Sequence, residues 1–225
     1  MENKKVLLVG GHGKIALLAI PKLVAAGHEV TAVIRNPDQS AELTALGAHP
    51  LVEDVSEISV QRWTELATTH DVVVWSAGNG GKAGPDVTYA VDQDAAVASM
   101  QGAVAAGEQA PRYIMVSWIG TFTFEAPPAG EREGFQHYAA AKREADTYLE
   151  GTDLNYVILG PSTLTDQPAG GIELLAADAA TYSNPATTSR ELVADVITEY
   201  VGLPQLPNKF APFTDGQDAI TVLPK

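Results

Sequence analysis

The chain has 225 residues, 45% apolar and 19% charged, a composition typical of a globular protein with one large domain and a sizeable core. Its formal net charge of −14 argues against nucleic acids and anionic membranes as partners, because their phosphates would be repelled. The absence of cysteine excludes disulfide bonds, a thiolate nucleophile and a Cys-ligated metal.

The beginning of the chain predicts its compartment. A strand is expected within the first few residues, without a secretory signal before it, and no apolar run is long enough to span a bilayer. We therefore expect a cytoplasmic protein.

A strand, a glycine turn and a helix follow one another at the N-terminus. Residues 6–9 form a continuous apolar run, as in a strand buried on both faces of a parallel sheet. Apolar residues resume at helical spacing from Ile15 to Val24. Pro21 is expected to kink or loosen this helix without ending it.

The turn between them fits the pattern G-x-G-x-x-A of dinucleotide sites, from Gly11 to Ala16. Glycines allow a tight turn and a close approach to pyrophosphate, whose charge lies on the free N–H groups of the helix N-terminus. A glycine turn that merely joins a strand to a helix is the alternative. The predicted cofactor-binding residues of this segment are Gly10, Gly11, His12, Gly13, Lys14 and Ile15.

The rest of the chain alternates between strand and helix patterns. The predicted strands are 29–34, 49–52, 71–75, 112–117, 155–159 and a short final one at 219–223, and the predicted helices are 40–46, 59–69, 87–106, 137–149 and 189–202. Residues 118–136 and 164–171 are expected to be irregular, and 172–180 are mixed. This order predicts an α/β fold, a doubly wound parallel sheet (Rossmann fold) with helices on both faces.

We expect residues 1–225 to form one domain, with a small substrate-side region from about 161 to 225. The ligand is expected beyond the carboxyl ends of the first and fourth strands, where the strand order reverses.

The end of the second strand predicts the cofactor. Sites for NAD usually place a carboxylate there, whereas Arg accommodates the 2′-phosphate of NADP, and here Arg35 is followed by Asn36. We therefore predict NADP(H), with NAD(H) as the lesser alternative; a solvated surface Arg35 also fits. After the third strand, Asp54 either accepts a hydrogen bond from the adenine amino group or is simply solvated. Further predicted contacts to the cofactor are Val55, Ser76, Ala77 and Gly78.

A second motif, Tyr138-Ala-Ala-Ala-Lys142, places a phenol and an ammonium on one helix face. A nearby ammonium is expected to lower the pKa of the phenol from about 10, so that it can transfer a proton, and also to hold the nicotinamide ribose. Ser117, at the end of the fifth strand, would donate to a substrate carbonyl. The predicted catalytic residues are thus Ser117, Tyr138 and Lys142; an exposed helix with an incidental Tyr and Lys is the alternative.

Two other kinds of site are not expected. The histidines show no metal-ligand spacing with one another or with acidic residues, so no metal site is predicted. A Ser-His-Asp hydrolase is disfavoured because the G-x-S-x-G nucleophile elbow is missing.

Together, GGHGKIA at 10–16, Arg35, SAG at 76–78, MVS at 115–117 and YAAAK at 138–142 resemble the short-chain dehydrogenase/reductase superfamily. The resemblance is strongest to its atypical branch, related to NmrA-like and biliverdin/flavin-reductase-like proteins, and it extends through SRELVADVI near the C-terminus. It implies a Rossmann fold, NADP(H), and a triad of Ser117, Tyr138 and Lys142. Two departures stand out: Gly160 precedes Pro161 where the branch usually has Arg, and residues 87–106 offer no counterpart of the Asn of many proton relays.

Two functions follow from these observations. The first is an NADP(H)-dependent oxidoreductase that transfers a hydride to or from a small carbonyl or related redox substrate. The second is a non-catalytic NADP(H)-binding regulator of the NmrA-like kind, whose partner senses its cofactor occupancy. The expected partner of the enzyme is a small molecule, and the phenylalanines within 118–136 are expected to shield the nicotinamide side of the site.

Overall fold

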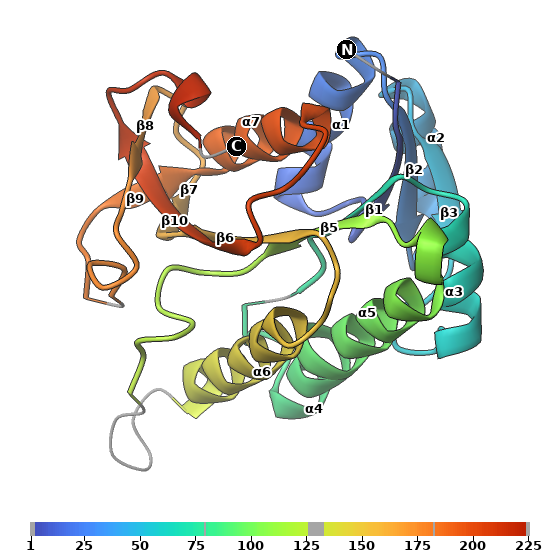
Figure 1. The fold of residues 1–225 in the computed structure, drawn as a ribbon, viewed down its shortest axis with the longest axis horizontal. Helices are drawn as coiled ribbons and strands as arrows, with labels where there is room; N and C mark the ends of the chain where they lie inside the picture. Colours follow the sequence, from blue (N-terminus) through green and yellow to red (C-terminus); the bar gives the residue numbers. More distant parts are fainter. Residues whose placement is uncertain (1–2, 79, 126–132, 182, 224–225) are drawn as a thin grey trace.

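The computed structural model describes residues 3–78, 80–125, 133–181 and 183–223, and its centre is an eight-stranded sheet (Figure 1). The strand order is β3-β2-β1-β4-β5-β6-β10-β8, in which only β8 runs antiparallel to its neighbour. The strands are β1 (Lys5–Val9), β2 (Glu29–Ile34), β3 (His49–Val52), β4 (Val72–Trp75), β5 (Arg112–Val116), β6 (Tyr156–Pro161), β8 (Gly171–Leu174) and β10 (Lys209–Gly216). The predicted doubly wound fold is confirmed, and its first six strands lie where the sequence pattern placed them.

Helices cover both faces of this sheet (Figure 1). One face packs against α1 and α7, and the other packs against α3, α5 and α6, so that each face has its own apolar core. The helices are α1 (Lys14–Ala25), α2 (Ser40–Ala45), α3 (Val60–Thr68), α4 (Pro85–Thr88), α5 (Ala96–Ala105), α6 (Glu133–Glu150) and α7 (Arg190–Gly202), with 3₁₀ turns at Pro37–Gln39, Gly107–Gln109 and Ile220–Val222.

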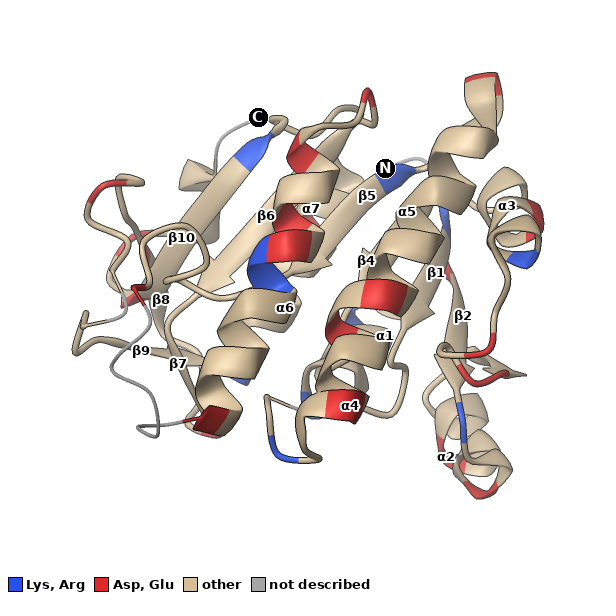
Figure 2. Cartoon of the chain, turned by 90° about the horizontal axis from the view of Figure 1, so that it is seen from below, with Lys and Arg blue, Asp and Glu red and all other residues tan. Residues whose placement is uncertain are grey.

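Local chemistry explains several boundaries. Helix α1 continues past Pro21 to Ala25, as the apolar period predicted. Ser59 and Ser189 cap α3 and α7, since each hydroxyl accepts a hydrogen bond from the N–H three residues further on. Acidic residues lie on several helices, among them α2, α3, α4 and α6 (Figure 2).

The helix predicted over 87–106 is instead composite. Helix α4 passes into a π-helical segment, Tyr89–Ala95, before α5 begins. Helix α6 covers Glu133–Glu150, so residues 133–136, expected to be irregular, are helical.

The C-terminal prediction is wrong in two places. Residues 219–223 contain a 3₁₀ turn, and the last strand is β10, which the sequence analysis missed. Pro212 lies inside β10 opposite Gly160 of β6, and a proline in a strand pattern argues against a strand within a sheet. The segment expected to be a loop from 164 onward begins within β7 (Thr163–Thr165), which pairs with β9 (Thr187–Ser189). Strands of three residues are too short to give a periodic pattern.

Candidate functional site

The glycine turn between β1 and α1 forms one wall of a cleft of about 340 Å³ beside the ends of β2 and β4. Gly10 has a φ of +80°, and a Cβ atom there would lie 2.7 Å from the Ala77 backbone, so only glycine lets these two loops meet. The cleft is lined by Gly10, Gly11, His12, Gly13, Val33, Ile34, Arg35, Gln39, Glu53, Asp54, Val55, Ser76, Ala77, Gly78, Ala83, Val87 and Val91. It therefore lies beyond the carboxyl ends of β1 and β4, as predicted.

Most of the predicted cofactor residues line this cleft; the exceptions are Lys14, Ile15 and Asn36. Arg35 is exposed at the end of β2, and its guanidinium lies 3.9 Å from the Asp54 carboxylate. Asp54 also accepts hydrogen bonds from the N–H and hydroxyl of Ser56, which lower its pKa, and Arg35 adds a smaller effect in the same direction. Asn36 does not line the cleft; its side chain accepts from the N–H of Asp38 and caps the following 3₁₀ turn.

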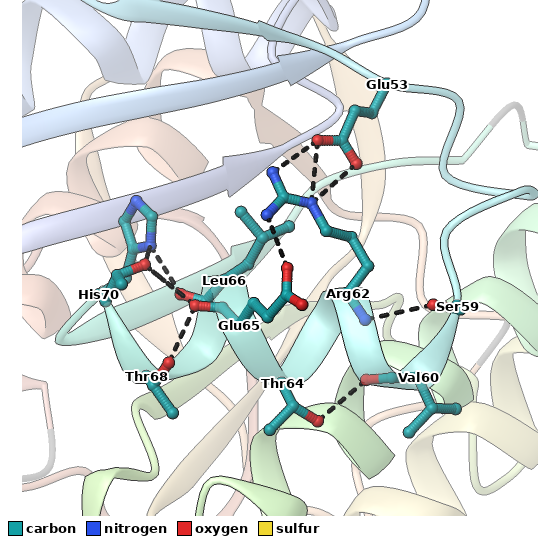
Figure 3. A network of polar contacts seen from close by, with 10 residues as sticks. Glu53, Ser59, Val60, Arg62, Thr64, Glu65, Leu66, Thr68 and His70 are labelled. Atoms are coloured by element: carbon teal, nitrogen blue, oxygen red, sulfur yellow. Dashed lines mark hydrogen bonds and ion pairs between the residues drawn. The ribbon is translucent and has the colours of Figure 1, made fainter.

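An ion-pair network fixes the wall that Asp54 belongs to (Figure 3). Arg62 on α3 donates to Glu53 at 2.8 Å and to Glu65 at 3.1 Å. Glu53 follows β3 directly and precedes Asp54, so the network ties this loop to α3. The network thus holds the loop that carries Asp54 against α3.

A second cleft of about 280 Å³ continues from the first, since Gly13, Ser76, Ala77 and Gly78 line both. Its other lining residues are Lys14, Ile15, Gly80, Lys82, Asp92, Val116, Ser117, Tyr138, Lys142, Leu164 and Arg190. The structure thus brings Ser117, Tyr138 and Lys142 into one cleft, at the end of β5 and along α6. Among the predicted cofactor residues, Lys14 and Ile15 lie on this side of the turn.

Lys142 is a buried cation that contacts the end of β5. Its side chain is 1% exposed, and its ammonium donates to the Val116 carbonyl at 2.9 Å and contacts the Met115 sulfur at 3.7 Å. An ammonium has three N–H donors, so one remains for a group in the cleft.

Beneath Ser117 lies a carboxylate that sequence reasoning missed. Asp146, one helical turn beyond Lys142 on α6, is completely buried and accepts hydrogen bonds from Ser117 and, at 2.7 Å, from Thr121. Its other oxygen has no hydrogen-bond partner among the described residues. Burial raises the pKa of Asp146, while Lys142, Ser117 and Thr121 act in the opposite direction. The spacing of four residues from Lys142 was the available signal.

These contacts change the expected role of Ser117. A hydroxyl has one proton to donate, and in this structure Ser117 donates it to Asp146. The expectation that Ser117 donates to a substrate carbonyl is therefore not met here.

Tyr138 differs from its prediction in the sign of its pKa shift. Burial raises the pKa of Tyr138, and the carboxylates of Asp92 and Asp146 reinforce this, whereas a lowered pKa was expected from Lys142. A negative charge nearby disfavours a second one, so the phenol stays protonated. Lys142 acts on Asp146, whose pKa it lowers, and bonds to the Val116 carbonyl.

Aromatic residues surround the Tyr138 ring. Trp118 lies 6.2 Å and Phe135 5.9 Å from it between ring centres, and Phe124 packs against both of these residues. Trp118 and Phe135 of 118–136 thus lie beside Tyr138, whereas Phe122 packs against Phe210, 5.2 Å away. Pro127 and Pro128 of that stretch lie outside the described residues.

The π-helical segment adds another residue that was not predicted. Asp92 is 1% exposed, lines the second cleft and lies so close to Gly78 that a Cβ there would overlap its carboxylate. Single π-helical turns frequently occur at functional sites. A lone acidic pair in an alanine-rich helix, Asp92 and Asp94, was the only signal in the sequence.

Gly160 has a steric explanation. A Cβ atom at this position would lie 2.4 Å from the Phe210 ring and 3.1 Å from Pro212. The ring of Phe210 on β10 thus occupies the space that an Arg before Pro161 would need.

Neither a metal centre nor a membrane-spanning helix is found in the part of the chain that the structure describes. No group of three or more His, Asp or Glu side chains in this part of the chain is arranged to hold a metal ion. No helix within the described ranges is long and apolar enough to cross a membrane.

Comparisons with known proteins agree with the dinucleotide-binding cleft that the glycine pattern predicts. A family model described as NAD(P)H-binding matches residues 10–204. A Bacillus subtilis protein named uncharacterized sugar epimerase YhfK is 32% identical over 179 residues, which cover 77% of this chain and 78% of that protein.

Two solved structures are similar over nearly the whole chain. A Bacillus halodurans protein named as an NAD-dependent epimerase/dehydratase has 31% identity and a TM-score of 0.83, with 97% of each chain covered. The oxidoreductase YlbE of Lactococcus lactis has 26% identity and a TM-score of 0.80, with 96% of this chain and 93% of that chain covered.

Proposed function

This chain belongs to the NAD(P)H-binding family, and we propose that it is an NADP(H)-dependent oxidoreductase that transfers a hydride to or from a small carbonyl or related redox substrate. The observation that carries the proposal is the continuity of the two clefts, which share four residues of the glycine turn and β4 loop. A dinucleotide bound across them would place its adenosine beside Arg35 and its reactive ring beside Tyr138.

The preference for NADP(H) is supported by the residues at the end of β2. Arg35 lines the first cleft, and its partner Asp54 lies 3.9 Å away, a loose contact that leaves the guanidinium able to meet a 2′-phosphate. His12, which lines the same cleft, pairs with Glu42 at 2.7 Å and so helps to fix the turn.

The chemistry of reduction is supported by the second cleft. When bound there, the cofactor supplies the hydride, and the protein supplies orientation and a proton. Tyr138, whose raised pKa keeps it protonated, would give its proton to the substrate oxygen as the carbonyl carbon accepts the hydride, which yields an alcohol. Lys142 would hold a hydroxyl of the ribose through its remaining N–H, and the Ser117 oxygen, whose proton goes to Asp146, would accept a hydrogen bond from a hydroxyl of the ligand.

Screening small carbonyl compounds for NADPH oxidation tests this function. We expect turnover of at least one class of carbonyl compound by the native protein, measured as loss of NADPH fluorescence. If the protein binds NADPH tightly but no compound oxidises it above background, the proposal fails and the regulator is favoured.

Epimerisation is a second candidate, because two of the similar proteins carry epimerase names. An epimerase would interconvert stereoisomers without net consumption of the cofactor. A sugar mixed with the protein and catalytic amounts of cofactor would then be converted to its epimer at one carbon, as NMR would detect, without net oxidation of NADPH.

A further inference from the structure

The second cleft is positively charged in an otherwise acidic molecule. Four of the 14 Lys and Arg residues of the chain line it: Lys14, Lys82, Lys142 and Arg190. Among the described residues that line it, Asp92 is the only carboxylate. In a chain whose formal net charge is −14, such a gathering of cations favours an anionic ligand in this cleft.

Two of these cations already hold a carboxylate at the edge of the cleft. Asp166 accepts from the Lys14 ammonium at 2.8 Å through one oxygen and from the Arg190 guanidinium at 2.7 Å through the other. These contacts lower the pKa of Asp166. Lys14 and Arg190 are thus spaced to bind one carboxylate group, with one oxygen on each cation, as Asp166 does here.

The small β7–β9 sheet explains how this arrangement arises. Thr165 of β7 pairs with Ser189 of β9, so the next residue on each strand, Asp166 and Arg190, leave the sheet side by side. Ser189 is completely buried, and its N–H and hydroxyl both donate to Asp215 at 2.9 Å. The backbone that carries Arg190 is therefore fixed, while Lys14 approaches from the first turn of α1.

Asp166 itself is held weakly. Its side chain is 63% exposed, as is 67% of that of Lys14, and ion pairs at such exposure contribute little because water screens them. The Arg190 side chain is only 21% exposed. A carboxylate of a ligand in the cleft would bind Arg190, the less exposed cation, and displace the exposed and weakly held carboxylate of Asp166.

We propose that Lys14 and Arg190 bind a carboxylate of the substrate, and that Asp166 occupies this place until the substrate arrives. The inference rests on the proposed function only in that the ligand is taken to be the substrate of the reductase. It defines the substrate class as a small carbonyl compound that also carries a carboxylate, with its reactive carbon toward Tyr138 in the same cleft.

Calorimetric titration of the NADP⁺-saturated protein with succinate, and with succinamide as its neutral counterpart, tests this site. We expect succinate to bind and succinamide not to bind. Arg190→Gln should weaken succinate binding about tenfold or more, since hydrogen bonds to charged groups are strong. Asp166→Asn should tighten it about two- to fivefold, because a tethered, weakly held competitor is removed.

Lys22→Gln is the matched control. It removes the same charge from the protein, but Lys22 pairs with Asp195 at 2.6 Å and does not line the cleft. Succinate affinity should be unchanged in this variant. An equal loss in Lys22→Gln and Arg190→Gln would reduce the effect to net charge and contradict the site.

Three further results would overturn the proposal. They are succinate binding that Asp166→Asn weakens, inorganic phosphate binding as tightly as succinate, and NADP⁺ affinity falling in Arg190→Gln as much as succinate affinity. The last would assign Arg190 to the phosphates of the cofactor. Because binding is read as heat, and the titration is repeated without NADP⁺, a lack of carbonyl turnover would sink the proposed function and leave the carboxylate site measurable.

Discussion

Tyr138 is the proposed proton donor of the reaction, so its protonation state matters to the mechanism. Burial and the carboxylates of Asp92 and Asp146 raise its pKa, so it is protonated at every pH at which the protein is expected to work. A protonated phenol is an acid, which suits donation to the oxygen of a carbonyl under reduction. The YxxxK spacing placed Tyr138 and Lys142 on one cleft, but the sign of the shift differs from the prediction because burial desolvates the phenol, an effect to which Asp92 and Asp146 add.

The ionisation of tyrosine offers a direct check without substrate. Between about pH 8 and pH 11, tyrosinate absorbance near about 295 nm should rise equally in the native protein and in Tyr138→Phe, since Tyr138 does not lose its proton there. A difference of one tyrosine that titrates at or below about pH 10 would contradict the raised pKa.

Asp146 predicts a pH dependence of stability. Its pKa in the folded protein lies above that of the unfolded chain, so ionisation costs folded-state stability as pH rises from the unfolded pKa through the folded one. Each unit of separation corresponds to about 1.4 kcal/mol. Asp146→Asn removes this cost, so its free energy of unfolding relative to the native protein should increase from about pH 4 upward and then level off. Urea unfolding of both proteins across this range measures it; a constant difference would show that Asp146 does not titrate as described.

At the scale of elements, the first six strands could be predicted from their short apolar or β-branched runs. Those of β1, β4, β5 and β6 are largely buried, whereas β3 at the edge of the sheet is not. The C-terminal strands were not predictable in the same way. Pro212 within β10 argues against a strand in the sequence pattern. Strands β7 and β9 are too short to show an alternation of apolar and polar residues. The cofactor cleft could be predicted from the glycine pattern. The placement of Asp92, Asp146 and Arg190 at the site could not, because it depends on which elements the fold brings together.

The crossing of α3 and α5 gives a prediction at this scale. A Cβ atom at Gly102 would lie 2.4 Å from the Trp63 Cβ and 2.8 Å from the Thr64 nitrogen, where only backbone movement makes room. Gly102→Ala should therefore destabilise the protein by about 1–3 kcal/mol, although alanine favours a helix. Gly151→Ala, whose Cβ would meet no atom closer than 3.4 Å, is the control and should change stability little. Thermal unfolding distinguishes the two, and equal effects would contradict the close crossing.

At the scale of the whole molecule, an acidic chain with a net charge of −14 has to bind an anionic cofactor through local cations. Arg35→Ala should weaken NADPH binding about tenfold, because a charge-assisted contact to the 2′-phosphate is lost. The affinity for NADH, which lacks that phosphate, should not change. Fluorescence titration of both cofactors measures this; tighter binding of NADH than of NADPH by the native protein would contradict the preference.

The most direct test of the account is the rate of NADPH oxidation by native protein and Tyr138→Phe, with a carbonyl substrate that the native protein reduces. Tyr148→Phe, on the same helix but outside the second cleft, is the control. We predict that Tyr138→Phe slows turnover about 10²- to 10⁴-fold and leaves NADPH affinity unchanged. Tyr148→Phe should reduce the substrate at the native rate. Equal turnover by native protein and Tyr138→Phe would show that Tyr138 is not the proton donor, and would contradict the mechanism.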